Sequence, residues 1–296
     1  MGHTFSPLRY PGGKSKLCQF VLETIKRNKI EKPIYCEPFC GGAGIAINLL
    51  LSESVDSIII NDYDTAIYSI WYAIVKDTED FIKKIRDTDI DMNMWHIQKN
   101  IYDKCIANNS DYNLEFAFAT FFLNRTNVSG IIEGGPIGGY KQQSNYKVYC
   151  RFNKESLIKK ITDIANFKEK ISLYNKDASA LVEENLINCC NENLFVYFDP
   201  PYYKQGKNLY KNFFDDNDHV ALAQSIKRMD NYKWITTYDN STRIQEIYSD
   251  RDIYGYELQY SVNRVRKETE LMFASKTTKL SSGNNVKLHK LFTFTK

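Results

Sequence analysis

The ten residues Leu194–Tyr203, which read LFVYFDPPYY, decide how this chain is organised. Five apolar or aromatic residues, Leu194–Phe198, run without interruption into the tetrapeptide Asp199–Tyr202 (DPPY). Such a run is typical of a buried parallel strand, and the two prolines end it because proline has no N–H for a strand ladder. Ligands of open α/β sheets bind at the carboxyl ends of strands. The stretch therefore predicts an α/β fold with a site at this strand end.

The tetrapeptide carries groups that suit a planar amine on a nucleobase. Such an amine is a poor nucleophile because its lone pair is delocalised into the ring. If the Asp199 carboxylate and the Pro200 carbonyl accept its two N–H groups, the lone pair is freed and the positive charge that grows on nitrogen is stabilised. Pro201 adds a second carbonyl, and the Tyr202 ring can stack on the base. An ordinary turn with Asp199 as a cap is the alternative, so other segments must decide.

The bulk composition is that of an ordinary soluble globular protein. The chain has 296 residues, of which 43% are hydrophobic and 25% charged, enough for one large domain or two modest ones. No apolar run approaches the roughly 20 residues of a membrane helix, and the first residues have no secretory core, so we expect a cytoplasmic protein. Seven cysteines without paired C-x-x-C sets and four scattered histidines predict no metal site. The net charge of +3 means that a nucleic-acid partner needs a local basic patch.

A glycine loop lies between two short apolar segments near the amino terminus. The pattern is a strand over residues 34–36, the loop Glu37–Gly44 (EPFCGGAG), a helix over 45–51, and a strand over 57–62 that ends in Asp62. The dinucleotide fingerprint fails because Ile47 stands where it requires glycine or alanine. Asp62 nevertheless lies at about the distance at which such folds bind ribose hydroxyls. The set predicts an adenosine-containing cofactor, and a plain βαβ unit capped by Asp62 is the alternative.

A turn shaped by proline and glycine, Ser6–Ser15, comes before this unit. Its Gly-Lys-Ser sequence suggests a P-loop, but Leu8 stands where that motif needs glycine and no strand precedes it, which excludes nucleotide hydrolysis. The turn presents Lys14 at the start of a helix over about residues 15–28. Lysines and helix N-termini both attract anions such as a carboxylate. A capped turn with a solvated lysine explains this stretch equally well.

The composition changes between residues 77 and 154. Three helical patterns, over 79–86, 92–107 and 112–123, lead into a glycine-rich segment that is laced with tyrosines. The segment from Asn124 to Lys154 contains one acid, Glu133, and five basic residues (Arg125, Lys141, Lys147, Arg151, Lys154). This composition suits a loop that lies on a phosphate backbone and stacks on bases, although a merely solvated loop is the alternative.

The rest of the chain alternates helices and strands. A helix over 155–170 and a strand over 171–174 lead to Asp177, which is placed either to accept from a cofactor adenine or to cap a helix over 178–188. After the Asp199 strand we expect a helix over 218–229, a strand over 233–240, a short helix over 243–248, a closing hairpin over 256–262 and 270–275, and an edge strand over 289–295.

The order of five motifs resembles the Dam-type adenine-specific DNA methyltransferases, the α-group. They are Pro11–Lys14 (PGGK), Glu37–Gly44, Asn61–Asp62, Asp177 and Asp199–Tyr202. The resemblance implies a Rossmann-like sheet with helices on both faces, S-adenosylmethionine as methyl donor, and a mainly helical target-recognition insert. It divides the chain into a catalytic domain, 1–76 with 155–296, and a DNA-recognition insert, 77–154.

The resemblance also implies roles for individual residues. It places the donor among Tyr10, Gly13, Lys14, Glu37, Pro38, Phe39, Gly41, Gly44, Asp62 and Asp177, with Asp62 on the ribose and Asp177 on the adenine. It assigns the target base to Asp199, Pro200, Pro201 and Tyr202. Asn124 and Arg125 match the start of the family's DNA-contacting segment, and Lys141, Lys147 and Arg151 are expected on the backbone.

This chain departs from the family pattern at two places. The glycine loop holds one extra residue, and the segment 126–147 does not follow the members that methylate GATC, so no recognition sequence is predicted.

The sequence therefore predicts transfer of a methyl group to the exocyclic amine of a flipped adenine in double-stranded DNA by a monomer or weak dimer. The same chemistry on RNA adenine, a cytosine amine or a glutamine amide stays open. A non-catalytic DNA-binding module is disfavoured by intact Lys14, Asp62 and Asp199, and a nicotinamide oxidoreductase by Ile47.

Overall fold

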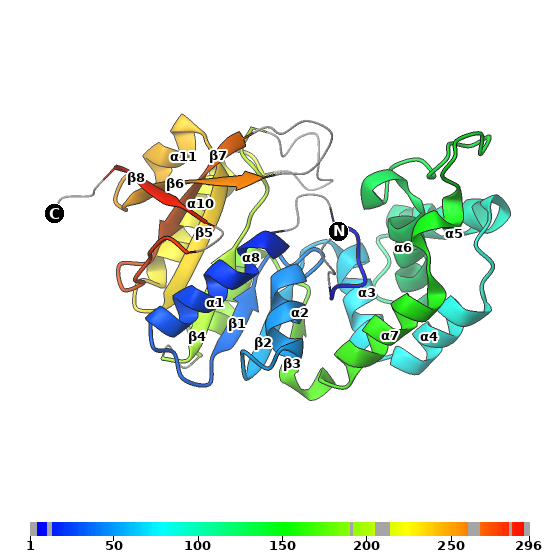
Figure 1. The fold of residues 1–296 in the computed structure, drawn as a ribbon, viewed down its shortest axis with the longest axis horizontal. Helices are drawn as coiled ribbons and strands as arrows, with labels where there is room; N and C mark the ends of the chain where they lie inside the picture. Colours follow the sequence, from blue (N-terminus) through cyan, green and yellow to red (C-terminus); the bar gives the residue numbers. More distant parts are fainter. Residues whose placement is uncertain are drawn as a thin grey trace.

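The computed structural model describes residues 5–10, 14–189, 192–204, 214–259, 267–283 and 286–292. It is built around an eight-stranded sheet of order β3-β2-β1-β4-β5-β7-β6-β8 (Figure 1). The five strands from β3 to β5 are parallel, whereas β7 runs antiparallel to β5 and β6, and β8 antiparallel to β6. The strands are β1 (Ile34–Glu37), β2 (Ser57–Asn61), β3 (Ile171–Tyr174), β4 (Leu194–Phe198), β5 (Lys233–Asp239), β6 (Ile253–Gln259), β7 (Lys267–Ala274) and β8 (Leu288–Phe292).

The predicted strand Leu194–Phe198 is β4, and all five of its residues are buried. It lies between β1 and β5 in parallel register, with Val196 opposite Cys36 on one side and Trp234 on the other. Side chains of β4 alternate between two apolar clusters, because successive strand residues point to opposite faces of a sheet. Phe195 and Tyr197 belong to one cluster, and Val196 and Phe198 to the other.

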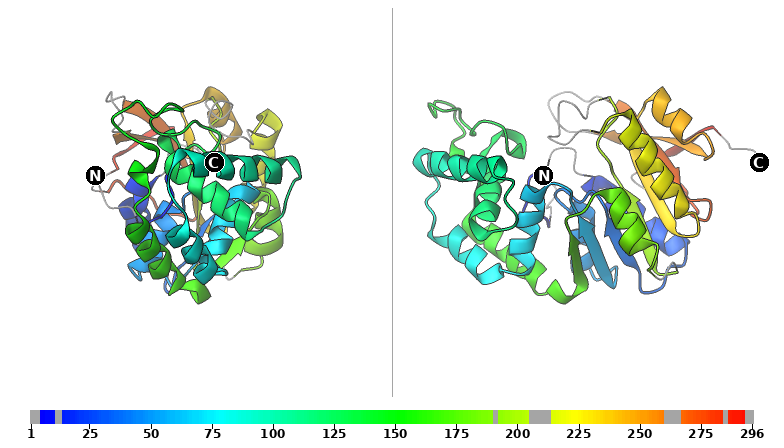
Figure 2. Two further views of the ribbon diagram at one scale, coloured as in Figure 1. Left: turned by 90° about the vertical axis from the view of Figure 1, so that its right-hand side faces the viewer. Right: turned by 180° about the vertical axis from the view of Figure 1, so that it is seen from behind.

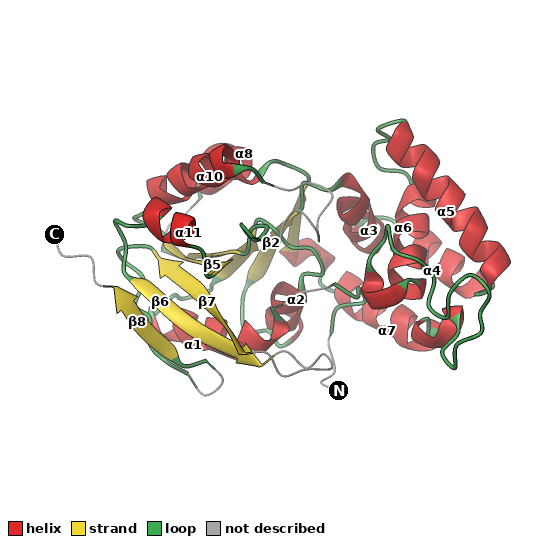
Figure 3. Ribbon diagram, turned by 90° about the horizontal axis from the view of Figure 1, so that it is seen from above, coloured by secondary structure: helices red, strands yellow, loops and turns green. Residues whose placement is uncertain are grey.

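Helices cover both faces of the sheet. In the view of Figure 3, α1 and α2 lie on one side of the strands and α8, α10 and α11 on the other. The helices are α1 (Cys18–Arg27), α2 (Gly44–Leu51), α3 (Thr65–Val75), α4 (Thr78–Asp87), α5 (Met92–Ala107), α6 (Leu114–Thr126), α7 (Lys154–Ala165), α8 (Ala178–Leu181), α10 (Asp216–Arg228) and α11 (Thr242–Ile247). Short turns are η1 (Ser15–Leu17), η2 (Val128–Gly130), η3 (Val148–Arg151), η4 (Lys168–Lys170) and the π-helical η5 (Val182–Leu186).

Three predicted helices are shorter than their patterns indicated. The helix expected over about residues 15–28 is the 3-10 turn η1 followed by α1, which ends at Arg27. The helix expected over 155–170 ends at Ala165 and is followed by the separate turn η4. The helix expected over 178–188 is α8 followed by a π-helical turn, in which the Ile187 N–H donates to the Val182 carbonyl at 3.0 Å. The closing hairpin is confirmed as β6 and β7, and the edge strand as β8, although residues 260–266 and 293–296 lie outside the described part.

The helices α4, α5, α6 and α7 form a lobe beside the β3 edge of the sheet (Figures 1 and 2). Its central helix, α6, is almost wholly buried and packs against α3 and α5. One hydrophobic core runs from α1 and α2 through α3 into this lobe, so lobe and sheet share their interior. The division of the chain at residues 77 and 154 stays a prediction. Within the lobe, α7 packs against α4, although α7 lies almost wholly beyond the predicted boundary at residue 154.

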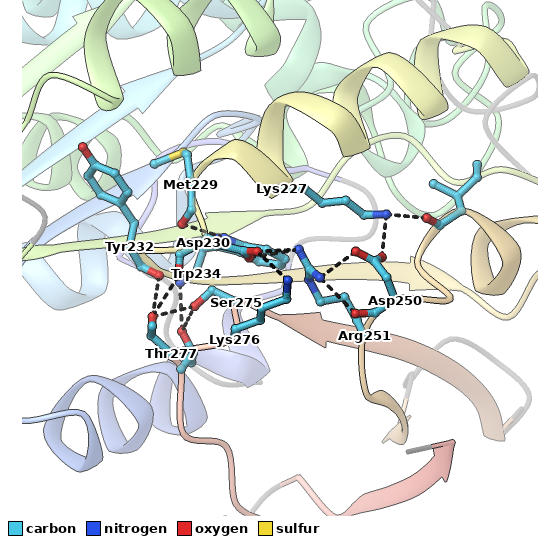
Figure 4. Close-up of polar contacts among 12 residues, drawn as sticks. Lys227, Met229, Asp230, Tyr232, Trp234, Asp250, Arg251, Ser275, Lys276 and Thr277 are labelled. Carbon is cyan, nitrogen blue, oxygen red and sulfur yellow. Dashed lines mark hydrogen bonds and ion pairs between the residues drawn. The ribbon is translucent and has the colours of Figure 1, made fainter. Parts of the chain in front are cut away.

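A network of ion pairs joins the turns at the end of β5 that lies away from Asp199 (Figure 4). Arg251, 4% exposed, donates to Asp230 at 2.9 Å and to Asp250 at 2.6 Å. Lys227 also pairs with Asp250 at 2.6 Å, and Lys276 with Asp230 at 3.4 Å. The network borders a cavity of about 400 Å³ and connects the loops before β5 and β6 with the one after β7.

Among the described residues, no helix combines the length and the apolar character that crossing a membrane requires.

Candidate active site

The carboxyl ends of β1, β2 and β4 meet where the strand order of the sheet reverses. Glu37 is the last residue of β1, Asp62 follows β2, and Asp199 follows β4. The crevice outside such a reversal, between β1 and β4, is where open α/β sheets bind ligands. The fold therefore brings together three of the acids that the sequence singled out.

Asp62 supports the glycine loop. Its carboxylate accepts the Gly41 N–H at 2.8 Å and the Asp64 N–H at 3.0 Å, and the Trp71 indole donates to the Gly41 carbonyl at 2.8 Å. Gly41 has φ +45°, and a Cβ there would lie 2.6 Å from the Tyr10 ring, so this position requires glycine. Burial raises the pKa of Asp62 to about 7, and the neighbouring Asp64 adds to the rise.

Glu37 links β1 to the start of α2. It is 5% exposed, and its Oε1 accepts the Tyr35 hydroxyl and the Ala46 N–H, both at 3.0 Å. Burial raises the pKa of Glu37 to about 8 against the effect of these two hydrogen bonds. The carboxyl is therefore mainly neutral at pH 7.

The other residues of the glycine loop that were predicted to bind the methyl donor are Pro38, Phe39 and Gly44. The Pro38 carbonyl accepts from the Asn61 amide at 2.8 Å, which ties the loop to the end of β2. The partly exposed Phe39 packs edge-on against Phe214 with ring centroids 6.0 Å apart. Gly44 is the first residue of α2. Pro11, Gly12 and the predicted Gly13 lie outside the described residues.

Asp199 is partly buried at the end of β4. Its Oδ1 accepts the Thr237 hydroxyl at 2.8 Å, and that hydroxyl lies 2.8 Å from the Tyr197 hydroxyl. Burial raises the pKa of Asp199 to about 6, although the Lys14 ammonium and the Thr237 hydrogen bond oppose the rise. At pH 7 the group is therefore mainly a carboxylate, the form that accepts hydrogen bonds at both oxygens.

Lys14 and Tyr202, 188 residues apart in sequence, meet beside Asp199. The Lys14 ammonium hydrogen-bonds to the Tyr202 hydroxyl, and it lies 4.8 Å from the centroid of the Tyr202 ring. It also pairs with Glu270 at 2.7 Å, and both side chains of this pair are buried. The solvated lysine that the sequence left open is therefore excluded.

Sequence reasoning missed four residues of this site. Thr237 and Glu270 contact Asp199 and Tyr202 directly, and Tyr256 contacts Glu270. Asp239 accepts the N–H groups of Tyr203 at 2.8 Å and Lys204 at 2.9 Å, and thereby holds the chain that leaves the tetrapeptide. Acids at buried positions of otherwise apolar strands were the available signal, since Asp239 and Glu270 are partners in the β5–β7 register.

Asp177 is exposed after β3 and caps α8. Its Oδ1 accepts the N–H groups of Ser179 at 2.9 Å and Ala180 at 3.2 Å. The capping function that the sequence left open is thus present, and contact with a cofactor adenine stays a prediction.

Asn124 and Arg125 hydrogen-bond to the backbone of the N-terminal segment, residues 5–10. Asn124 is 1% exposed, accepts the Arg9 N–H at 2.9 Å and donates to the carbonyls of Arg9 at 2.7 Å and Gly130 at 2.9 Å. Arg125 donates to the carbonyls of Arg151 at 3.0 Å and Pro7 at 3.2 Å. Burial, with Arg9 and Arg151 nearby, lowers the pKa of Arg125 to about 10. In this structure both side chains hold backbone of the protein itself.

The remaining predicted DNA contacts lie in the loop between α6 and α7. Lys141 and Arg151 are exposed, and Lys147 donates to the Gln142 carbonyl within the loop. The same loop exposes three tyrosines by 59% to 66% (Tyr140, Tyr146, Tyr149), which gives it both the charge and the aromatic surface expected from its sequence.

A Rossmann-like sheet with acids at the ends of β1, β2 and β4 and a glycine loop between them defines the class of α/β methyltransferases. Residues 10–262 match the family model of the D12 class N6 adenine-specific DNA methyltransferases, so the chain belongs to that family. It is an enzyme that moves a methyl group from S-adenosylmethionine to adenine in DNA.

Two similar solved structures are both of the rRNA methyltransferase AviRa from Streptomyces viridochromogenes. They are 11% and 10% identical to this chain, with TM-scores of 0.38 and 0.37, and each comparison covers 91% of this chain and 87% of the other. Among curated proteins, none has a sequence that matches this chain significantly.

Proposed function

We propose that this enzyme is a Dam-type, α-group member of its family that methylates the exocyclic amine of adenine at a specific site in double-stranded DNA. The observation that carries the proposal is the position of Asp199, Lys14 and Tyr202 beside the glycine loop and Asp62, across the reversal of the strand order. Donor and target sites then share one crevice, as direct transfer between them requires.

The residues around the glycine loop fit S-adenosylmethionine. Asp62 is partly exposed, and a carboxylate is a suitable acceptor for two ribose hydroxyls. The side-chain-free Gly41 lets a ligand approach the backbone closely. We assign the donor pocket to Tyr10, Gly13, Lys14, Glu37, Pro38, Phe39, Gly41, Gly44, Asp62 and Asp177. When bound, the donor supplies an electrophilic methyl group on a sulfonium.

The tetrapeptide Asp199–Tyr202 holds the target amine. The Asp199 carboxylate and the Pro200 carbonyl accept its two N–H groups, which orients the nitrogen lone pair and stabilises the charge that forms on it. Pro201 keeps the backbone extended beyond the strand, and the Tyr202 ring stacks on the base. Because the amine lies inside a duplex, the adenine must be flipped out to reach these groups.

Residues 77–154 act as the DNA-recognition insert in this proposal. Lys141, Lys147 and Arg151 contact phosphates, which positions the enzyme without reading sequence. Asn124 and Arg125 contribute by fixing the N-terminal segment against the insert, in keeping with their hydrogen bonds to Arg9 and Pro7.

Replacing Asp199 tests the proposal. Asp199→Ala should abolish methylation, by roughly 100-fold or more in kcat, while donor binding stays largely intact. Asp199→Asn should behave alike, because its NH2 group cannot accept a hydrogen bond. The measurements are transfer of labelled methyl to duplex DNA, RNA and protein, and calorimetric titration of the donor.

The control is Asp163→Asn, which alters a partly exposed acid on α7 that pairs with Lys159. Near-normal methylation by Asp199→Ala contradicts the assigned role of Asp199. Transfer by the wild type to RNA or protein in place of duplex DNA contradicts the proposed substrate.

A further inference from the structure

A buried carboxylate on β7, Glu270, has no part in the function proposed above. It is 3% exposed, and its carboxylate accepts hydrogen bonds from three side chains of the described part of the chain. The donors are the Lys14 ammonium at 2.7 Å, the Tyr202 hydroxyl at 2.7 Å and the Tyr256 hydroxyl at 2.5 Å. Lys14 directly precedes η1, Tyr202 belongs to the tetrapeptide after β4, and Tyr256 lies on β6.

A carboxylate in such a place is unfavourable unless it is well paired. Desolvation of a buried ion costs several kcal/mol, and only good geometry with further hydrogen bonds repays it. Glu270 meets that condition, because an ammonium and two hydroxyls satisfy its two oxygens. Charge-assisted hydrogen bonds are also shorter and stronger than neutral ones, so this carboxylate is suited to fixing side chains in place.

Two of the side chains that Glu270 holds belong to the proposed site: Tyr202, whose ring is assigned to the target base, and Lys14, which is assigned to the donor pocket. The Tyr202 hydroxyl donates to Glu270 Oε1, and the Lys14 ammonium, which is bonded to Oε2, donates to the same hydroxyl. A tyrosine anchored at its hydroxyl cannot swing about its Cα–Cβ bond without breaking that hydrogen bond. The position and the long axis of its ring are therefore fixed before any base arrives.

We propose that Glu270 is a positioning residue for methyl transfer, whose carboxylate holds the Tyr202 ring and the Lys14 ammonium in fixed places beside Asp199. The inference rests on the proposed function, because it assumes that the adenine stacks on Tyr202. Preset geometry of this kind acts mainly on kcat, since misplacing reacting groups by about 1 Å lowers a rate by roughly 100-fold.

The electrostatic environment of Asp199 supplies an independent readout. The ionisable groups that interact with Asp199 in the described part of the chain include Lys14, Glu37 on β1, Tyr197 on β4, Tyr238 on β5, Tyr256 on β6 and Glu270 on β7. Thr237 on β5 donates a hydrogen bond to Asp199. Lys14 lowers the pKa of Asp199, whereas Glu270 raises it. Glu270→Gln removes a negative charge but leaves Lys14, so the pKa of Asp199 should fall below its value of about 6. The acid limb of the kcat/KM profile should move to lower pH.

The test compares wild type, Glu270→Gln, Tyr202→Phe and the double variant on duplex DNA. Each single change should lower kcat about 10-fold to 100-fold, with KM for DNA changed much less. If both act by freeing the same ring, the double variant should be no slower than the worse single one. Tyr202→Phe keeps the Lys14–Glu270 pair, so it remains informative if Glu270→Gln fails to fold, which thermal denaturation reveals.

Two results overturn the inference: a Glu270→Gln enzyme with wild-type kcat and an unmoved acid limb, or losses that multiply in the double variant. Asp163→Asn serves as the control with a removed carboxylate and unchanged kcat. A wild type that does not methylate duplex DNA defeats the proposed function instead, and so the two failures are told apart.

Discussion

Glu37 illustrates how a single buried carboxyl couples this fold to pH. Its folded pKa of about 8 lies above the ordinary glutamate value of 4.5, so between these values the native state keeps a proton that the unfolded chain releases. The unfolded state then binds fewer protons, and the free energy of unfolding falls as pH rises through that window. The contribution is unfavourable and reaches its full size above pH 8.

Glu37→Gln should remove this dependence. Glutamine retains an oxygen that accepts from Tyr35 and Ala46, and it replaces the protonated oxygen by an NH2 group of similar size. The variant should match the wild type near pH 5 and exceed its free energy of unfolding at pH 8, by up to roughly 5 kcal/mol. Urea denaturation at pH 5, 7 and 8 measures the difference, with the exposed Glu31→Gln as control. Parallel pH curves for wild type and Glu37→Gln would show that Glu37 titrates normally.

At the scale of elements, the N-terminal segment 5–10 joins the helical lobe to the glycine loop. Asn124 on α6 holds both backbone groups of Arg9, and the Asn127 carbonyl accepts from the Arg9 side chain at 2.8 Å. The next residue, Tyr10, lies against Gly41. A displacement of the loop after α6 would therefore be transmitted to the donor pocket through one short stretch of chain.

Two glycines of this loop allow a matched test. Gly130 (φ +79°) and Gly139 (φ +72°) both have left-handed backbones, but a Cβ on Gly130 would lie 2.3 Å from the Arg9 carbonyl oxygen, whereas Gly139 has open space. Gly139→Ala should cost only about 1 kcal/mol of backbone strain. Gly130→Ala should lose more stability in urea denaturation and also weaken donor binding, because Arg9 and Tyr10 must move. Equal effects of the two changes on donor affinity would argue against this coupling.

At the scale of the whole molecule, the net charge of +3 leaves DNA binding to one local surface. In our proposal that surface is the loop between α6 and α7, where Lys141 and Arg151 are exposed. A contact between a lysine or arginine and a phosphate releases counterions, so affinity falls with salt in proportion to the number of such contacts.

Lys141→Ala and Arg151→Ala should each weaken duplex DNA binding for all sequences alike. Each should reduce the slope of log affinity against log salt by about 1. Fluorescence anisotropy over a salt series measures both quantities. Lys159→Ala, on an exposed position of α7 paired with Asp163, is the control that should leave the slope unchanged. If neither loop variant changed the slope of log affinity against log salt, this loop would not be part of the DNA interface.

Local pattern alone was enough for the strands and most of the helices. The apolar run of β4 ended by two prolines, and the glycine loop between β1 and α2, are local features, because burial period and proline geometry act within a few residues. The same locality explains the errors at α7 and α8, where the pattern continued beyond the residues that tertiary contacts keep helical.

The sequence by itself determined the α/β class, the carboxylates at strand ends and the family of this enzyme, since these depend on short motifs in a fixed order. Only the tertiary structure decided which distant groups complete the site. Thr237, Asp239 and Glu270 reach the tetrapeptide because β5 pairs with β4 and β7 with β5. The sequence of one strand does not show which strand will pair with it, because strand pairing depends on how the whole core packs.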